Sequence, residues 1–182
     1  SSLSKVLDEP PVELLIAALE KPSHRETIRL TALQQLAKSS DLKVQDVLFE
    51  WTKPGKPPLC RPEACQQLVE FANHNLLPKP ETDRIVKHLL EMLDQSGPRM
   101  RGSIASALGS LGNRAGSATT RLQELTKAEP NDWTRASIKT ALARISAPAS
   151  DTAALTKLQK ELDEARSHSR SLEERLFRLE AP

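Results

Sequence analysis

The sequence predicts an all-α protein, built as a solenoid of paired helices and followed by one long heptad helix. Three observations lead to this prediction. The chain of 182 residues contains no Tyr and only 3% aromatic residues, whereas β-strands are rich in aromatic and β-branched side chains. The chain is instead built from Leu, Ala, Glu, Lys, Arg and Gln, which favour helices. Prolines and glycines divide it into helix-sized pieces with apolar residues at helical spacing.

Eight amphipathic segments precede residue 147, and short turns join them into four pairs. Most breaks fall at Pro or Gly, which interrupt or end helices. Ser23 and Asp41 are expected N-caps, and Gly112 is an expected C-terminal stop. The predicted helices cover residues 11–21, 24–38, 42–53, 61–75, 81–95, 99–112, 117–129 and 132–145.

The second helices of these pairs share a pattern. Arg101 is followed by Ala, Leu and Leu six, seven and ten positions later, and Arg135 is followed by Ala, Leu and Ile at the same intervals. Arg61 fits less closely, and the first pair fits when Glu26 takes the arginine position. A period of roughly 35–40 residues with two helices per unit is typical of stacked α-solenoids. In these folds neighbouring pairs bury each other's apolar faces, and the small Ala lets second helices approach closely.

The segments RGSIASALGSLG (101–112) and DWTRASIKTALARI (132–145) resemble HEAT repeats. In that family a turn, often with Asp, precedes an Arg that opens the second helix, and Asp132 with Arg135 matches this arrangement. The resemblance implies a right-handed α-solenoid of about four pairs, with a binding or scaffold role and no shared catalytic residues. The stretch WTKPGKPP (51–58) is similar to one near the C-terminal helical domain of zinc aminopeptidases. An accessory domain of a larger enzyme is therefore an alternative.

The apolar pattern changes at Asp151. We expect a leader over 1–10, HEAT-like repeats over 11–146, a linker over 147–150 and a coiled-coil helix over 151–182. A period of 3.5 residues favours a coiled coil, and the expected role is a homodimer. Folding back as a cap on the last repeat and docking on another protein are the alternatives. Of the eight core positions, two hold Ala165 and Ser169. Leucines occupy the other six: Leu155, Leu158, Leu162, Leu172, Leu176 and Leu179.

The net charge of +2 is distributed unevenly. Residues 97–145 hold eight basic and three acidic side chains, whereas residues 1–96 hold 12 basic and 14 acidic ones. A basic half favours acidic partners, and a plain solvated surface is the alternative interpretation. We predict that a protein or acidic peptide binds there. Nucleic-acid binding through the same basic half is an alternative, and the near-neutral total charge and the few aromatic residues count against it. The predicted partner-binding residues are Arg99, Arg101, Arg135, Lys139 and Arg144.

Catalytic and metal-binding patterns are missing from the sequence. It contains no H-E-x-x-H, no phosphate-binding glycine loop and no dinucleotide-binding glycine motif. The glycines of the segment 101–117 are interpreted as packing and turn positions. We expect His88 to lie at the surface, and Trp51 and Trp133 to pack in the core or in turns rather than serve as binding platforms. These features predict a protein that is not an enzyme and holds no metal or cofactor.

Two further features concern the environment of the protein. Cys60 and Cys65 are expected to be buried free thiols, which fits a reducing, intracellular and cytoplasmic setting. No apolar run reaches about 18 residues, so no membrane span is predicted.

Overall fold

Eight α-helices and no strand make up residues 11–147, the part of the chain that the computed structural model describes. The predicted all-α class is confirmed for this part, whereas the predicted leader and heptad leucines lie outside it. The unit that contains the helices ends at Ser146. The helices are α2 (Val12–Leu19), α3 (Thr27–Leu36), α4 (Lys43–Thr52), α5 (Cys60–His74), α6 (Lys79–Asp94), α7 (Pro98–Ser110), α8 (Thr119–Ala128) and α9 (Asp132–Ile145). Two short 3-10 segments, η1 (His24–Glu26) and η2 (Gly112–Ala118), precede α3 and α8.

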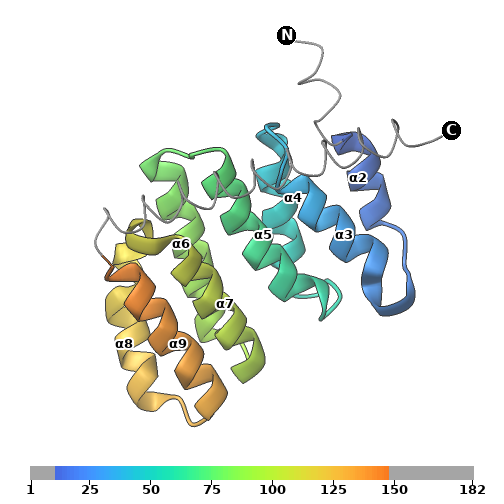
Figure 1. The fold of residues 1–182 in the computed structure, drawn as a ribbon. Coiled ribbons are helices and arrows are strands. Elements are labelled where there is room, and N and C mark those ends of the chain that lie inside the picture. The colour runs from blue at the N-terminus through green and yellow to red at the C-terminus, as the bar shows by residue number, and fades with distance from the viewer. Residues whose placement is uncertain (1–10, 148–182) are drawn as a thin grey trace, which may run out of the picture. The chain divides into compact units, whose positions relative to one another are not determined.

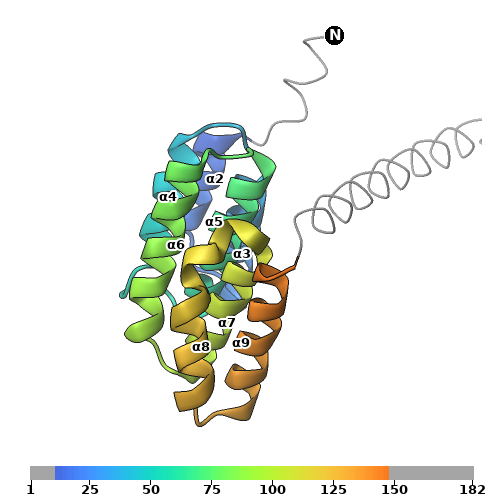
Figure 2. The same ribbon diagram turned by 90° about the vertical axis from the view of Figure 1, so that its left-hand side faces the viewer.

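The helices are arranged in pairs and in two rows. Each first helix packs on the helix that follows it, giving the pairs α2–α3, α4–α5, α6–α7 and α8–α9. The second helices α3, α5, α7 and α9 also contact one another in succession, and the contact between α7 and α9 is the most extensive (Figure 1). The first helices α4, α6 and α8 lie on the other side of this row (Figure 2).

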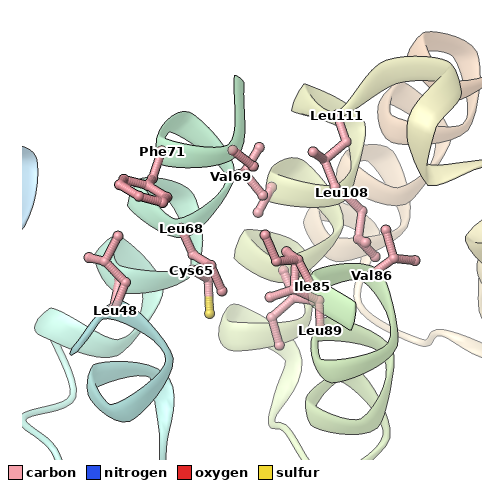
Figure 3. Packing of buried hydrophobic residues seen from close by; sticks show 14 of the residues in the cluster. Leu48, Cys65, Leu68, Val69, Phe71, Ile85, Val86, Leu89, Leu108 and Leu111 are labelled. Atoms are coloured by element: carbon pink, nitrogen blue, oxygen red, sulfur yellow. The ribbon is translucent and has the colours of Figure 1, made fainter. Parts of the chain in front are cut away.

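The hydrophobic core fills the space between the two rows. Figure 3 shows apolar side chains from α4, α5, α6 and α7 meeting there, and none of Leu48, Phe71, Leu89 and Leu108 has measurable exposure to solvent. Burying one such side chain contributes about 1.5–3 kcal/mol. A single helix pair could not bury these faces, so each pair depends on its neighbours.

Small residues let α7 and α9 approach closely. A Cβ atom added to Gly109 would lie 2.9 Å from Cα of Ala141 and 3.1 Å from its Cβ. A Cβ atom on Gly102 would lie 2.4 Å from Cζ3 of Trp133. The interpretation of these glycines as packing positions is thus confirmed, and Gly112, with φ of 59°, ends the helix in the left-handed conformation expected of a C-terminal stop.

An arginine near the start of each second helix closes the turn within its pair. Each one donates a hydrogen bond to a backbone carbonyl at or just beyond the end of the first helix, where the helix dipole favours a cation. The donor–acceptor pairs are Arg29 Nε to Leu19 O (2.7 Å), Arg61 Nε to Thr52 O (3.0 Å), Arg101 Nη1 to Ser96 O (2.5 Å) and Arg135 Nη2 to Pro130 O (3.4 Å).

In the first pair the closing contact comes from Arg29, three residues after Glu26, which the sequence pattern aligned with the arginine position. Arg29 also forms an ion pair with Glu26 at 2.7 Å. The helix α3 begins at Thr27, directly after Arg25 and Glu26, which have positive φ angles of 52° and 59°. The N-cap of α4 is Leu42, one residue after the predicted Asp41, whose Oδ1 accepts from the backbone amide of Lys43 at 2.9 Å.

The close contact of α7 with α9 leads to a test of stability. Gly109→Ala should lower the free energy of unfolding by up to about 2 kcal/mol, because overpacking typically costs about 1–3 kcal/mol and Ala regains about 1 kcal/mol in helix propensity. Gly116→Ala is the matched control, since a Cβ there meets nothing within 4 Å, and its effect should stay within about 0.5 kcal/mol. Urea denaturation measures both, and equal stabilities would contradict the packing.

Candidate functional site

An open groove lies where the N-terminal ends of α5, α7 and α9 come together. Its volume is about 660 Å³. The lining includes Leu59, the residue before α5, Gly97, the residue before α7, and Trp133, the second residue of α9. These ends meet because each second helix returns along its own first helix, so the second helices run in the same direction (Figure 1).

Trp133 differs from the expectation for a packing residue. Its ring lies against Gly102, yet 57% of the residue is exposed. Trp51, in contrast, is 5% exposed and confirms the prediction of a core position. Two cations flank the Trp51 ring, with Arg29 Cζ at 5.8 Å and Lys56 Nζ at 4.9 Å from its centroid. The two tryptophans therefore have different roles, because only Trp133 presents a free aromatic surface.

Apolar and charged side chains surround Trp133 in the groove. Leu59 is 48% exposed and Met100 is half-buried. The exposed Arg99 makes no ion pair with any residue of the described part, 11–147. Glu63 accepts hydrogen bonds from the side-chain amides of Gln34 (2.8 Å) and Gln67 (2.9 Å). Leu59 and Met100 were not predicted as site residues, and the one signal was the Pro-rich stretch WTKPGKPP (51–58), which ends directly before Leu59.

The five predicted partner-binding residues fall into two groups. Arg101 and Arg135 make intramolecular contacts, Arg101 with Glu129 at 2.7 Å and Arg135 with Asp132. The exposed Arg99, Lys139 and Arg144 have no ion pair within residues 11–147. Partner binding by these five residues stays a prediction. Within the described part, Arg99, Lys139 and Arg144 are the ones whose charge has no internal ion pair.

The helical geometry of α9 separates the exposed cations further. At about 100° per residue, Arg144 points within about 20° of Trp133, whereas Lys139 points about 120° away from it. Arg144 also lies beside Gly109 of α7, because a Cβ there would be 3.6 Å from its Cδ. Arg144 and Trp133 thus share the face of α9 that borders α7.

The ion pair of Arg101 with Glu129 is part of a satisfied buried network. Glu129 is 3% exposed, and its second carboxylate oxygen accepts from the amide of Asn131 at 3.1 Å. The hydrogen bond from Arg101 is the main cause that lowers the pKa of Glu129 below its ordinary value of 4.5. Both groups therefore stabilise the turn between α8 and α9.

A second hollow, between α4 and α6, contains His88. His88, expected at the surface, is half-buried, and its ring packs against that of Phe49 in a T-shaped arrangement with the ring centroids 4.9 Å apart. Thr52 Oγ1 donates to the carbonyl of Phe49 and lies 2.7 Å from His88 Nε2, so the ring nitrogen carries the proton and donates to Thr52. Burial lowers the pKa of His88. These contacts give His88 a structural role.

The cysteines are free and buried, as predicted. Burial raises the pKa of the Cys65 thiol to about 12, which leaves it unreactive as a nucleophile. Within residues 11–147, no group of three or more His, Cys, Asp or Glu side chains is placed to hold a metal ion. None of the helices in that part of the chain is both long and apolar enough to cross a bilayer.

No protein-family model, curated protein sequence or solved structure matches the chain. The resemblance to HEAT repeats therefore depends on the residues named above.

The network around Glu129 leads to a pH-dependent test. Arg101→Met should lower the free energy of unfolding by about 1–3 kcal/mol at neutral pH, because a buried carboxylate loses its cation. The pKa of Glu129 is lowered in the folded state, so the stabilisation is present above the ordinary value of 4.5 and is lost as the pH falls through the folded-state pKa. The difference between the wild type and the variant should therefore shrink in acid.

Denaturant unfolding at several pH values measures this difference. Arg99→Met is the matched control, since Arg99 is exposed and lacks an ion pair in the described part, and it should change stability by less than about 0.5 kcal/mol. A difference for Arg101→Met that stays constant with pH would contradict the assignment.

Proposed function

We propose that the chain is a non-catalytic protein-interaction module, in which HEAT-like helix pairs form an α-solenoid whose second helices bind a partner. Three features of the described part support this proposal. The helices occur in four pairs, each pair is closed by an arginine, and the second helices form a continuous row. A row of parallel helices offers one extended surface, as other α-solenoids do.

One observation carries the proposal, namely that cations with no ion pair within residues 11–147 share this row with an exposed tryptophan. Arg99 and Trp133 line the groove, and Arg144 lies on the face of α9 that Trp133 occupies. The basic residues elsewhere in 97–145 include several with internal contacts: Arg101, Arg114, Arg121 and Arg135. The free charge on α7 and α9 therefore favours an acidic peptide or an acidic protein surface.

Charge reversal tests the proposed surface. Random peptides selected on the wild-type chain should be acidic, and Arg99→Glu combined with Arg144→Glu should weaken their binding by about tenfold or more, which corresponds to about 1.4 kcal/mol. Isothermal titration calorimetry measures the affinities. Lys127→Glu is the matched control, because Lys127 is exposed on α8, in the row of first helices.

The control should leave peptide binding unchanged. Selected peptides without acidic character, or an equal effect of both charge reversals, would argue against this surface. Binding of a single-stranded oligonucleotide that falls steeply with salt would instead support the nucleic-acid alternative.

We also propose that residues 151–182 form a homodimeric coiled coil through their heptad leucines, a prediction that lies outside the described residues. The full chain should then have about twice the mass of one chain in solution, whereas a chain truncated after Ser150 should be a monomer. Light scattering measures both masses. Equal monomer masses would exclude the dimer and favour a helix that caps its own repeats.

A further inference from the structure

Trp133 is exposed although it has a packing partner. The ring atoms Cζ3, Cη2 and Cε3 lie beside Gly102, so close that a Cβ there would come within 2.4–3.2 Å of them. Gly102 is buried, yet the tryptophan above it remains 57% exposed. Gly102 therefore packs against these three atoms on one side of the six-membered ring, and the remaining aromatic surface is open to a ligand. Large aromatic rings usually bury most of their surface or serve as contacts at interfaces.

The surroundings of the ring are suited to an apolar side chain. Leu59 is 48% exposed, Met100 is half-buried, and Pro58 completes the apolar lining. The groove volume of about 660 Å³ lies within the range of sites that hold a small ligand, about 300–1,000 Å³. One large side chain with its adjacent backbone fits such a space.

The net positive charge of the groove favours a ligand in which an acidic residue lies next to that apolar side chain. Arg61 and Arg99 line it, against the single carboxylate of Glu63, which already accepts two amide hydrogen bonds. The N-terminal ends of α5, α7 and α9 add partial positive charge at the same place. Arg99 is exposed and lacks an ion pair within residues 11–147, so its guanidinium can bind a carboxylate.

We infer that this groove binds an extended acidic peptide segment by stacking one aromatic side chain on Trp133 and pairing an adjacent carboxylate with Arg99. This inference rests on the proposed function and names the chemistry of its partner. A peptide is favoured over a nucleic acid because single-stranded nucleic acids stack successive bases on several aromatic side chains. Among the described residues that line the groove, which are both apolar and polar, Trp133 is the single aromatic one.

Short capped peptides test the inference. The probe contains Asp, Glu and Gly with one central Phe, and the matched probe replaces that Phe with Ala. We expect the Phe peptide to bind at least about tenfold tighter in isothermal titration calorimetry. Trp133→Ala should reduce its affinity to that of the Ala peptide, whereas Trp133→Phe should retain most of the difference. Arg99→Glu should weaken both peptides.

Two controls keep the test specific. Leu42→Ala removes a large side chain that is 62% exposed and lies outside the groove, and it should leave both affinities unchanged. Thermal unfolding followed by circular dichroism shows that each variant is folded before its affinity is compared.

A further variant tests the position of the ring. Gly102→Ala should move the Trp133 ring, because the added Cβ would overlap it, and should weaken the binding of the Phe peptide alone.

The possible outcomes distinguish a failure of this inference from a failure of the proposed function. Equal affinity for the Phe and Ala peptides, with both weakened by Arg99→Glu, would overturn the aromatic platform and leave the acidic-partner surface in place. Peptides selected from a random library that bind outside the groove, with neither probe bound, would also overturn the inference while an interaction module remains. Salt-sensitive binding of single-stranded oligothymidylate, lost in Trp133→Ala, would overturn both.

Discussion

The arrangement of the helices depends on one recurring interaction, the hydrogen bond that an arginine of each second helix donates to close its helix pair. The guanidinium belongs to the second helix, and its acceptor is a carbonyl of the last residue of the first helix, in the first two pairs, or of the turn that follows it, in the last two. A hydrogen bond from a charged donor contributes about 1.5–3 kcal/mol, and in the first two pairs it also satisfies a carbonyl that the helix leaves without a partner. The contact fixes the turn in all four pairs. Because each second helix returns along its own first helix, all four second helices begin at the same end of the row.

That common direction produces the groove. With α5, α7 and α9 parallel, their N-terminal residues and their partial positive charges meet at one place. Close packing then determines what the groove exposes. Gly109 and Ala141 bring α7 and α9 together, and Gly102 gives the ring of Trp133 a support without burying it. The groove is thus a consequence of how the helices pack, and no single segment encodes it.

The basic half of the chain serves two purposes. Some cations stabilise the fold, as Arg101 does with Glu129 and as Arg114 does through the carbonyl of Leu77. Others, such as Arg99, face solvent without an ion pair in residues 11–147. Buried cations are held by their partners, and only the remaining ones are free to attract an acidic ligand. A charge count along the sequence cannot make this distinction, because it depends on contacts between residues 28 positions apart, as for Arg101 and Glu129.

The sequence alone determined the helical class, the pairing of the helices, most helix boundaries and the buried cysteines, because composition, apolar spacing and Pro or Gly breaks are local signals. Only the tertiary structure decided the rest. In the first pair the closing contact comes from Arg29, three positions after Glu26, and His88 is half-buried beside Phe49. Trp133 is a candidate binding residue because it packs against Gly102, 31 positions earlier in the chain, and still remains exposed. Such contacts arise from the stacking of separate helices, and no periodicity within one helix reports them.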